Sequence, residues 1–407
     1  MCLIRKFLIF FGILIILIQN NVYAVYIDGE TSYVWSESTM QTATGSEEPK
    51  DFLDLSCESA VLIEQTTGTV LYEKEPHKIL RPASVTKIMT ILLIMEAIDN
   101  GQICYDTKIT CSEEAASMGG SQIWLEVGET LTVDEMLKAI CIVSANDCCV
   151  AMAEHIAGTE SAFVIKMNEK AKQLGMNDTT FKNCHGIDED GHLTSSYDIA
   201  LMSKELLNKY PEVTKYTTTW MDSLREGQAE LVNTNKLIRT YEGATGLKTG
   251  STSLALYNLS ASATRENLSL IAVVLRAPTP TERVSNARNL LDYGFSNYEF
   301  VSTSTKGKVV KKVKVEKGTQ KELELSYKET SGTILKRGMS ANVESKININ
   351  KKISAPIKQG DILGKVEFYV DGKKIASSDL IANSSIEKIG VFTNFKCIVK
   401  NWFCLFR

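Results

Sequence analysis

The chain has 407 residues, of which 44% are apolar and 23% are charged. These values are typical of globular domains and exclude a mainly disordered, collagen-like or coiled-coil protein, and the length predicts two or three domains. The 45 Lys and Arg nearly balance the 49 Asp and Glu, and only four His occur, so neither a nucleic-acid-binding protein nor a histidine-rich metal site is indicated.

The N-terminus has the pattern of a secretory signal peptide. Arg5 and Lys6 precede an apolar run over residues 7–18, and the small residues Val22 and Ala24 form a cleavage site. The run is shorter than the roughly 20 residues of a membrane-spanning helix. We therefore predict a signal peptide over residues 1–24 and a protein that works outside the cytoplasm. An uncleaved membrane anchor is the alternative.

The next part of the chain predicts a linker, a hairpin and a buried helix. Residues 25–52 are rich in Ser, Thr and Glu and show no sustained periodicity, as in a linker. Residues 60–63 and 70–72 flank a Thr- and Gly-containing turn, which indicates a β-hairpin. A helix predicted to begin at Pro82 and to end near Asp99 is apolar nearly all round, so we expect it in the middle of a domain.

The middle of the chain predicts further helices. Thr132 and Glu135 form a capping-box pattern at the start of a second helix, which breaks at residues 144–146. Asp147 is predicted to cap a third helix that ends near Gly158.

More helices and strands complete this region. Residues 161–174, 197–209 and 281–292 are predicted to be helices, and residues 253–264 and 268–275 are predicted to be strands. The order of elements predicts an α/β (α+β) domain over residues 53–297, with an antiparallel sheet flanked by helices and a helical subdomain.

The C-terminal third has a different character. Short strands are predicted at residues 309–315, 322–325, 347–349 and 366–370. They indicate a small all-β domain over residues 298–385, a sandwich or barrel. Between positions 301 and 380 there are 17 Lys and Arg against 9 Asp and Glu. This basic surface is either simply solvated or turned toward anionic lipid or wall polymer.

The last segment, residues 386–407, predicts a basic amphipathic helix. Apolar residues recur at helical spacing and lysines lie outside that stripe. Such a segment, with Phe and Trp, suits the membrane interface, and it is too short and too charged to span a bilayer. We predict a surface anchor. A terminal helix docked on the protein itself is the alternative.

The chain has ten cysteines but no Cys-x-x-Cys pattern. Cys141, Cys148 and Cys149 lie in apolar, helix-like stretches, which predicts buried free thiols. Because exported proteins often contain disulfides, a bond between Cys104 and Cys111 is the alternative.

Ser84 and Lys87 are the first candidate catalytic pair. They lie three residues apart in the first turn of the buried helix, so their side chains share a face. A lysine in such a helix is unusual unless it is paired or functional. A neutral lysine can take the proton of a serine hydroxyl, which turns that serine into a nucleophile. Taken alone, Ser-x-x-Lys is a weak signal.

Two further motifs strengthen the interpretation. Residues 144–146 (Ser-Ala-Asn) lie in the break between two helices, and residues 248–250 (Lys-Thr-Gly) lead into a strand. Ser-x-x-Lys, Ser-x-Asn and Lys-Thr-Gly, in this order, occur together in β-lactamases and penicillin-binding proteins.

The sequence resembles the serine-type D-alanyl-D-alanine carboxypeptidases, the low-molecular-mass penicillin-binding proteins of peptidase family S11. The resemblance covers roughly residues 55–385. The segments that carry it, beside the three motifs, are residues 82–90, 119–121, 185–188, 194–200, 246–250 and 355–361. It implies a β-lactamase/transpeptidase-like fold for the first domain.

The resemblance also implies the roles of the catalytic residues. Ser84 attacks the carbonyl of the penultimate D-alanine and forms an acyl-enzyme. Lys87 is the base, kept neutral by burial and by the charge of Lys248. Ser144 relays protons toward the leaving amine, and Asn146 holds the substrate amide. Water then hydrolyses the ester.

The strand motif is expected to bind the rest of the substrate. Lys248, Thr249 and Thr252 are candidates for the terminal carboxylate, together with Arg283, for which Arg276 competes.

The backbone N–H groups of Ser84 and Ser251 would form the oxyanion hole, and Gly250, the last residue of the motif, directly precedes Ser251. Some members have histidine in place of Ser251. His185 and His192 are interpreted as structural loop residues.

The implied partners are peptidoglycan peptides that end in D-Ala-D-Ala, β-lactam antibiotics as covalent inhibitors, and the membrane surface through the C-terminal segment. No cofactor, metal or nucleic acid is expected. The expected location is the outer face of the cell membrane.

Two other functions share parts of this pattern. A class A β-lactamase needs Glu-x-x-Leu-Asn, and residues 205–208 are one residue short of it, inside a predicted helix. A non-catalytic protein that binds wall or senses antibiotics could keep the fold, although all motif residues are present.

Overall fold

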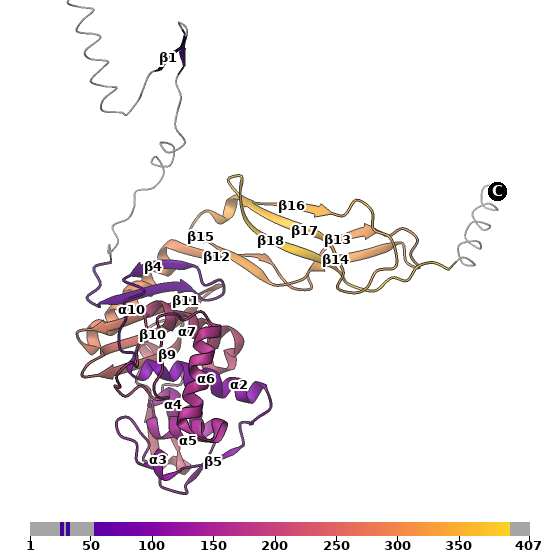
Figure 1. Cartoon of the computed structure of the whole chain (residues 1–407). Helices are drawn as coiled ribbons and strands as arrows, with labels where there is room; N and C mark the ends of the chain where they lie inside the picture. The colour runs from indigo at the N-terminus through magenta and orange to yellow at the C-terminus, as the bar shows by residue number, and fades with distance from the viewer. Residues whose placement is uncertain (1–24, 28–29, 33–52, 391–407) are drawn as a thin grey trace, which may run out of the picture. The chain divides into compact units, whose positions relative to one another are not determined.

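The computed structural model describes residues 25–27, 30–32 and 53–390 (Figure 1). The predicted signal peptide and most of the predicted anchor lie outside these residues. Within the predicted linker, β1 (Val25–Ile27) and β2 (Glu30–Ser32) pair as a short antiparallel ladder. The main body of the structure begins at Leu53.

A five-stranded antiparallel sheet forms the first domain, in the order β4-β3-β11-β10-β9. Its strands are β3 (Ser59–Glu64), β4 (Val70–Lys74), β9 (Ala244–Thr252), β10 (Leu256–Arg265) and β11 (Leu268–Ala277). The predicted hairpin is confirmed, and its strand β3 pairs with β11, more than 200 residues later. The Lys-Thr-Gly motif lies inside β9, not before a strand, and the strand predicted from position 253 begins at Leu256.

The sheet is covered on both faces. Successive residues of a strand point to opposite sides, so Val61 and Ile63 of β3 join the larger helical core, whereas Ala60 and Leu62 join a second core with α10 (Pro280–Asn297). Because both faces are buried, β3 and β11 in the middle of the sheet are almost continuously apolar. The predicted sheet with helices on its faces is confirmed.

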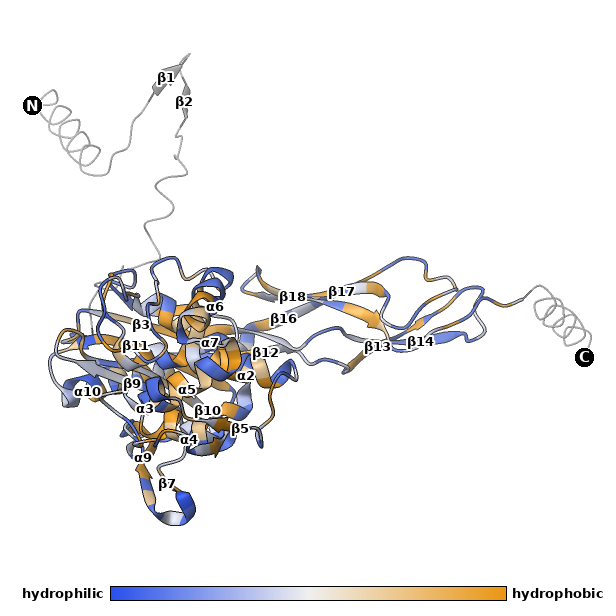
Figure 2. Cartoon of the chain, turned by 60° about the horizontal axis from the view of Figure 1, so that its bottom comes forward, coloured by the Kyte–Doolittle hydropathy of each residue, from blue (hydrophilic) through white to orange (hydrophobic). Residues whose placement is uncertain are grey.

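Five longer helices build the other core: α2 (Lys87–Asp99), α4 (Val133–Ile142), α5 (Asn146–Ala157), α6 (Glu160–Gln173) and α7 (Ser196–Lys209). As predicted, α2 is buried along nearly its whole length. Hydrophobic residues gather where α2, α5 and α7 lie (Figure 2). Shorter elements connect them: β5 (Lys108–Thr110), α3 (Glu113–Ala116), β6 (Thr130–Thr132), α8 (Thr214–Thr217), β7 (Met221–Leu224), β8 (Ala229–Val232) and α9 (Leu237–Thr240).

The two predicted helix caps have different outcomes. The capping box of α4 is confirmed, because the Glu135 amide donates to Thr132 Oγ1 and the Thr132 amide donates to Glu135 Oε2. The predicted cap of α5 by Asp147 is wrong. Asp147 lies inside the first turn, and its Oδ2 accepts hydrogen bonds from the amides of Ile123 and Leu125 in a distant loop.

The C-terminal domain is all-β, as predicted. A five-stranded sheet has the order β13-β14-β18-β17-β16, and β12 pairs with β15. The strands are β12 (Tyr298–Ser304), β13 (Val309–Lys314), β14 (Glu322–Tyr327), β15 (Ser331–Lys336), β16 (Val343–Ile349), β17 (Ile362–Val370) and β18 (Lys373–Ala382). The sequence did not predict β12, β15 or β18.

The predicted boundary between this domain and the anchor differs from the structure. Ile386 is 1% exposed and packs in the core of the C-terminal domain, and its backbone pairs with Ile357. Residues 386–390 therefore pack with the β-domain. Residues 391–407, which carry most of the predicted amphipathic pattern, lie outside the described residues.

Among the described residues, Cys104, Cys111, Cys141, Cys148, Cys149 and Cys184 are free thiols, and all of these except Cys104 are buried. The alternative of a disulfide between Cys104 and Cys111 is therefore wrong. Among the described helices, none is long and apolar enough to cross a bilayer by itself, and only α5 with α6 passes this test as a pair, bent by 84°. Within the described residues, no group of three or more His, Cys, Asp or Glu side chains could hold a metal ion.

Candidate active site

Ser84 and Lys87 meet at the start of α2. Ser84 lies in a 3-10 turn (Ala83–Thr86), and Lys87 is the first residue of the α-helix. In a 3-10 turn, side chains three residues apart eclipse one another. Lys87 Nζ accordingly lies 2.9 Å from Ser84 Oγ. The hydroxyl and the amine are thus in hydrogen-bond contact, as the spacing in the sequence indicates.

The amine of Lys87 is enclosed by neutral groups. Lys87 is fully buried, and Nζ donates to Asn146 Oδ1 at 2.7 Å and to the carbonyl of His185 at 2.5 Å. Burial lowers the pKa of Lys87, although Cys149, Cys184 and Asp147 oppose the shift. A lysine with a lowered pKa can exist as the free amine that accepts a proton.

Ser144 is held in an unusual position in the break before α5. Its φ of 70° is in the left-handed region, which is uncommon for residues with a side chain. It is 4% exposed, and its Oγ has no hydrogen-bond partner among the described residues. A buried hydroxyl without a partner in a native fold calls for an explanation, and a substrate or a transferred proton would supply the missing partner.

Strand β9 passes directly beside the nucleophile. A Cβ on Gly250 would lie 2.9 Å from the backbone nitrogen of Ser84, so only glycine allows this approach. Lys248, on the same strand, is 1% exposed, and its Nζ donates to the carbonyl of Thr249 at 2.9 Å. Burial, and then the charge of Lys87, lower the pKa of Lys248 well below its usual value. Two lysine amines therefore share one buried region.

The other predicted residues of β9 differ in their surroundings. Thr249 is mostly buried and its hydroxyl donates to Thr234 Oγ1 at 2.8 Å. Ser251 is exposed. Thr252 Oγ1 accepts a hydrogen bond from the amide of Ala255 at 2.9 Å. The hydroxyl of Thr252 thus already stabilises the turn between β9 and β10.

The two candidate arginines for the substrate carboxylate lie in different places. Arg283 of α10 reaches β9, where its Nη1 lies 3.4 Å from the carbonyl oxygen of Gly250, and its Nε has no hydrogen-bond partner among the described residues. Arg276 instead pairs with Glu58 at 2.6 Å and donates to the carbonyl of Leu254. The structure thus places Arg283, and not Arg276, against the Lys-Thr-Gly strand.

Two backbone loops complete the site, and the sequence reasoning gave neither a role. The loop at residues 119–121 supplies two carbonyls to Asn146, and the loop at residues 185–186 supplies the carbonyl that binds Lys87. Gly186 has a φ of 93°, and a Cβ there would lie 2.0 Å from the carbonyl oxygen of Ala83. Both loops belong to segments that carry the family resemblance, which is the only signal in the sequence that could have found them.

The histidines near the site are buried and neutral. Burial lowers the pKa of His185 to about 3 and that of His192 to about 4. The ring of His185 lies 3.5 Å from Glu160, and that of His192 hydrogen-bonds Thr86. These contacts hold the loops that surround Ser84 and fit the interpretation of both residues as structural.

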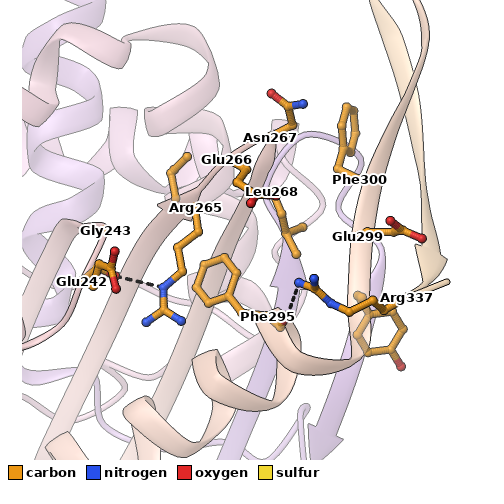
Figure 3. A pocket seen from close by; sticks show the side chains of 12 residues that line it. Glu242, Gly243, Arg265, Glu266, Asn267, Leu268, Phe295, Glu299, Phe300 and Arg337 are labelled. Atoms are coloured by element: carbon orange, nitrogen blue, oxygen red, sulfur yellow. Dashed lines mark hydrogen bonds between the residues drawn. The ribbon is translucent and has the colours of Figure 1, made fainter. Parts of the chain in front are cut away.

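A cavity of about 740 Å³ lies elsewhere, around the turn between β10 and β11. Arg265, Phe295, Phe300 and Arg337 are among its lining residues (Figure 3). Arg337 donates to the backbone carbonyl of Phe295, as the dashed line in Figure 3 shows. None of the three sequence motifs contributes to this cavity, so it is distinct from the site around Ser84.

Ser84 lies beside a buried lysine at the start of a helix, and the Lys-Thr-Gly strand lies against its backbone. This arrangement defines the class of serine acyl-transfer enzymes that use a lysine base. Residues 42–279 match the family described as D-alanyl-D-alanine carboxypeptidase, and residues 298–388 match the C-terminal domain of penicillin-binding protein 5. The chain belongs to the D-alanyl-D-alanine carboxypeptidases of peptidase family S11.

Individual relatives agree with this assignment. D-alanyl-D-alanine carboxypeptidase DacF of Bacillus subtilis is 50% identical over 348 residues, which cover 84% of this chain and 89% of the relative. DacC of Escherichia coli is 31% identical and covers 86% of this chain and 89% of the relative.

Solved structures agree as well. Penicillin-binding protein 5 of Haemophilus influenzae has a TM-score of 0.71 at 30% identity and covers 84% of this chain and 100% of that chain. Penicillin-binding protein D2 of Listeria monocytogenes, in an ampicillin-bound form, has a TM-score of 0.55 at 32% identity and covers 60% of this chain and 99% of that chain.

The protein is a serine-type D-Ala-D-Ala carboxypeptidase and a penicillin-binding protein. The predicted fold and activity are confirmed. The alternative of a class A β-lactamase is not supported, and residues 205–208 lie inside α7.

Proposed function

We propose that the protein removes the terminal D-alanine from peptidoglycan stem pentapeptides, with Ser84 as the nucleophile and Lys87 as the base. The observation that carries this proposal is the contact of 2.9 Å between Lys87 Nζ and Ser84 Oγ, in a buried place where every hydrogen-bond partner of the amine is neutral. A neutral amine at this distance can take the hydroxyl proton as the serine attacks.

The reaction then has two halves. In the first, Ser84 Oγ forms a bond to the penultimate D-alanine carbonyl, its proton moves to Lys87, and the C–N bond to the terminal D-alanine breaks. Ser144 passes its proton to the leaving amine and takes up the proton held by Lys87, so Ser144 is again a hydroxyl and Lys87 again a neutral amine. The hydroxyl of Ser144 has no hydrogen-bond partner among the described residues, so it is available for this relay. In the second half, water attacks the ester carbonyl and gives up a proton to Lys87. The bond between this carbon and Ser84 Oγ then breaks, and Lys87 returns the proton to Ser84 Oγ. The backbone amides of Ser84 and Ser251 stabilise the oxyanion in both halves.

The substrate is oriented by both sides of the site. Lys248, Thr249 and Arg283 on the β9 side provide charge and a hydroxyl for the terminal carboxylate. Asn146 Nδ2 donates one of its two N–H groups to the carbonyl of Gly119, so the other can bind the substrate amide. Thr252 Oγ1 accepts a hydrogen bond from the amide of Ala255, so its O–H can still donate to the carboxylate, whereas the O–H of Thr249 must leave Thr234 Oγ1 to do so.

β-Lactam antibiotics are proposed to acylate Ser84 in the same way. A β-lactam carries a strained amide and a carboxylate, which match the nucleophile and the cations of β9. The relative from Listeria in its ampicillin-bound form supports the inference.

The protein is further proposed to act on the outer face of the cell membrane. The signal-peptide pattern of residues 1–24 supports export, and the basic amphipathic pattern toward the C-terminus supports binding at the membrane surface. Because residues 386–390 pack with the β-domain, the anchor is assigned to residues 391–407.

One experiment tests the chemistry directly. The purified protein is incubated with a peptide that ends in D-Ala-D-Ala, and released D-alanine is measured. A labelled penicillin is then followed by mass spectrometry of the proteolysed protein. We expect release of D-alanine and a label on Ser84. Covalent uptake of the label by a Ser84→Ala variant would show that the nucleophile is another residue.

A further inference from the structure

Trp124 is the most exposed large apolar side chain of the described residues. Its side chain is 73% exposed, although its neighbours Ile123 and Leu125 are 4% and 3% exposed. Its backbone has a φ of 54°, in the left-handed region that a bulky residue rarely adopts. Such a conformation persists only where the surrounding structure enforces it, and it often marks a functional position.

Two charged side chains enforce this conformation. The buried carboxylate of Asp147 accepts hydrogen bonds from the amides of Ile123, at 3.0 Å, and Leu125, at 3.1 Å. Arg225 donates to the carbonyls of Ile123, at 2.9 Å, and Trp124, at 3.3 Å. Glu129 orients Arg225 through two hydrogen bonds of 2.7 and 3.0 Å. The backbone on both sides of Trp124 is therefore fixed while the indole remains in solvent.

The same loop is attached to the active site. The backbone amide of Asn146 donates to the carbonyl of Ser121 at 2.7 Å, and its side chain binds both Lys87 and Gly119. Trp124 follows Ser121 by three residues, a reach of about 10 Å for extended chain. The backbone of Trp124 therefore lies within about 10 Å of the group that binds Asn146, on the side of α5, whereas Lys248 and Arg283 lie on the side of β9.

The chain around this loop is acidic, and Arg225, the cation that contacts the loop among the described residues, is paired with Glu129. From residue 109 to residue 137 the chain has no Lys or Arg, but it has six Asp and Glu. Among them, Glu113, Glu114 and Glu126 are exposed. An exposed indole in negatively charged surroundings is suited to a cation with an aliphatic stem, because the face of the ring attracts positive charge within about 6 Å.

We propose that Trp124 is a specificity-determining residue that binds the amine-bearing side chain of the substrate peptide upstream of D-Ala-D-Ala. The proposal rests on the proposed orientation of the substrate. The terminal carboxylate is bound from β9, and Asn146 binds the amide on the acyl side. The peptide that leads away from the scissile bond then passes the loop that Asn146 holds, and its side-chain ammonium lies over the indole.

The test compares three substrates with the full-length protein. They are acetyl-D-Ala-D-Ala, a pentapeptide with lysine before D-Ala-D-Ala, and the same pentapeptide with that lysine acetylated on its side chain. For Trp124→Ala we expect kcat/KM to fall about tenfold with the lysine pentapeptide, mainly through KM. The values for the acetyl dipeptide and for acylation by benzylpenicillin should change less than about twofold. Trp124→Phe should retain part of the preference for lysine.

Val127→Ala is the matched control, because Val127 is 61% exposed in the same loop and should leave all rates unchanged. The acetylated pentapeptide tests the proposal without any mutation, since the unmodified protein should prefer the free amine by a similar factor.

Three outcomes would overturn the proposal: no preference for the free amine, no effect of Trp124→Ala, or an equal loss with all substrates. Inactivity of the unmodified protein on every peptide would instead reject the proposed function.

Discussion

Asn146 binds Lys87 through its side-chain oxygen at 2.7 Å, in contact with the amine that we propose as the base. The partner is neutral, so it positions the lysine and stabilises the ammonium form less than a carboxylate would. A carboxylate in the same place would favour the ammonium form and raise the pKa of Lys87.

We therefore predict that Asn146→Asp slows acylation by penicillin at neutral pH by more than tenfold. Since Lys87 must be neutral, activity is lost as the pH falls through its pKa, and a higher pKa moves this loss to higher pH. The acid limb of the profile of acylation rate against pH should accordingly shift upward. Asn267→Asp, in the exposed turn between β10 and β11, is the control and should keep the profile of the unmodified protein. If the acid limb does not shift in Asn146→Asp, the titration of Lys87 is not the cause of that limb.

Gly186 gives a prediction about the shape of the 3-10 turn that carries Ser84. An alanine Cβ there would lie 2.0 Å from the carbonyl oxygen of Ala83, next to Ser84. We expect Gly186→Ala to lower Tm and to reduce acylation of Ser84 strongly. Gly101→Ala is a matched control, because Gly101 also has a positive φ, 73°, but a Cβ there meets no atom within 4 Å. It should cost only the backbone strain, about 1–2 kcal/mol, and should leave acylation intact. Equal effects of both substitutions would contradict this account.

Arg283 and Arg276 give a paired prediction about the substrate carboxylate. Arg283 lies against Gly250, whereas Arg276 is engaged with Glu58. A hydrogen bond between charged groups contributes about 1.5–3 kcal/mol, so Arg283→Ala should lower kcat/KM for D-alanine release by about 10- to 100-fold. Arg276→Ala removes a partly exposed ion pair, which is worth about 1 kcal/mol or less. It should lower stability slightly and leave kcat/KM near its original value. The reverse pattern in steady-state kinetics would assign the carboxylate to Arg276.

Local parts of the site could be predicted from the sequence because they depend on short spacings. The contact between Ser84 and Lys87 follows from helical geometry, and the cap of α4 follows from Thr132 and Glu135. The contribution of His185 could not be derived, because the group that binds Lys87 is a backbone carbonyl, which every residue has.

Other predictions differ from the structure because of interactions between residues far apart in the sequence, or because the local pattern is weak. Asp147 is a residue type that often caps helices, but its carboxylate instead accepts hydrogen bonds from the amides of Ile123 and Leu125. A local sequence pattern cannot predict hydrogen-bond partners that lie so far away in the chain. In the C-terminal domain, β12, β15 and β18 contain many Ser, Thr and Lys residues and are only partly buried. Their alternation of apolar and polar residues is therefore too weak to mark strands.

The final prediction concerns where the membrane anchor begins. Ile386 is 1% exposed, and its amide and carbonyl both bond to Ile357 at 2.9 Å. A chain that ends at Gly390 keeps these contacts and loses only residues 391–407, so it should fold, bind penicillin and move from the membrane fraction to the soluble one.

A chain that ends at Ser385 also loses the buried side chain of Ile386, and removal of such a side chain costs about 2–5 kcal/mol. The shorter chain should therefore show a lower Tm for the C-terminal domain, which calorimetry can separate from that of the penicillin-bound first domain. Fractionation of both truncated chains distinguishes an anchor from a loss of folding. If the chain that ends at Gly390 stays with the membrane, the anchor lies elsewhere, and an uncleaved N-terminal segment becomes the explanation.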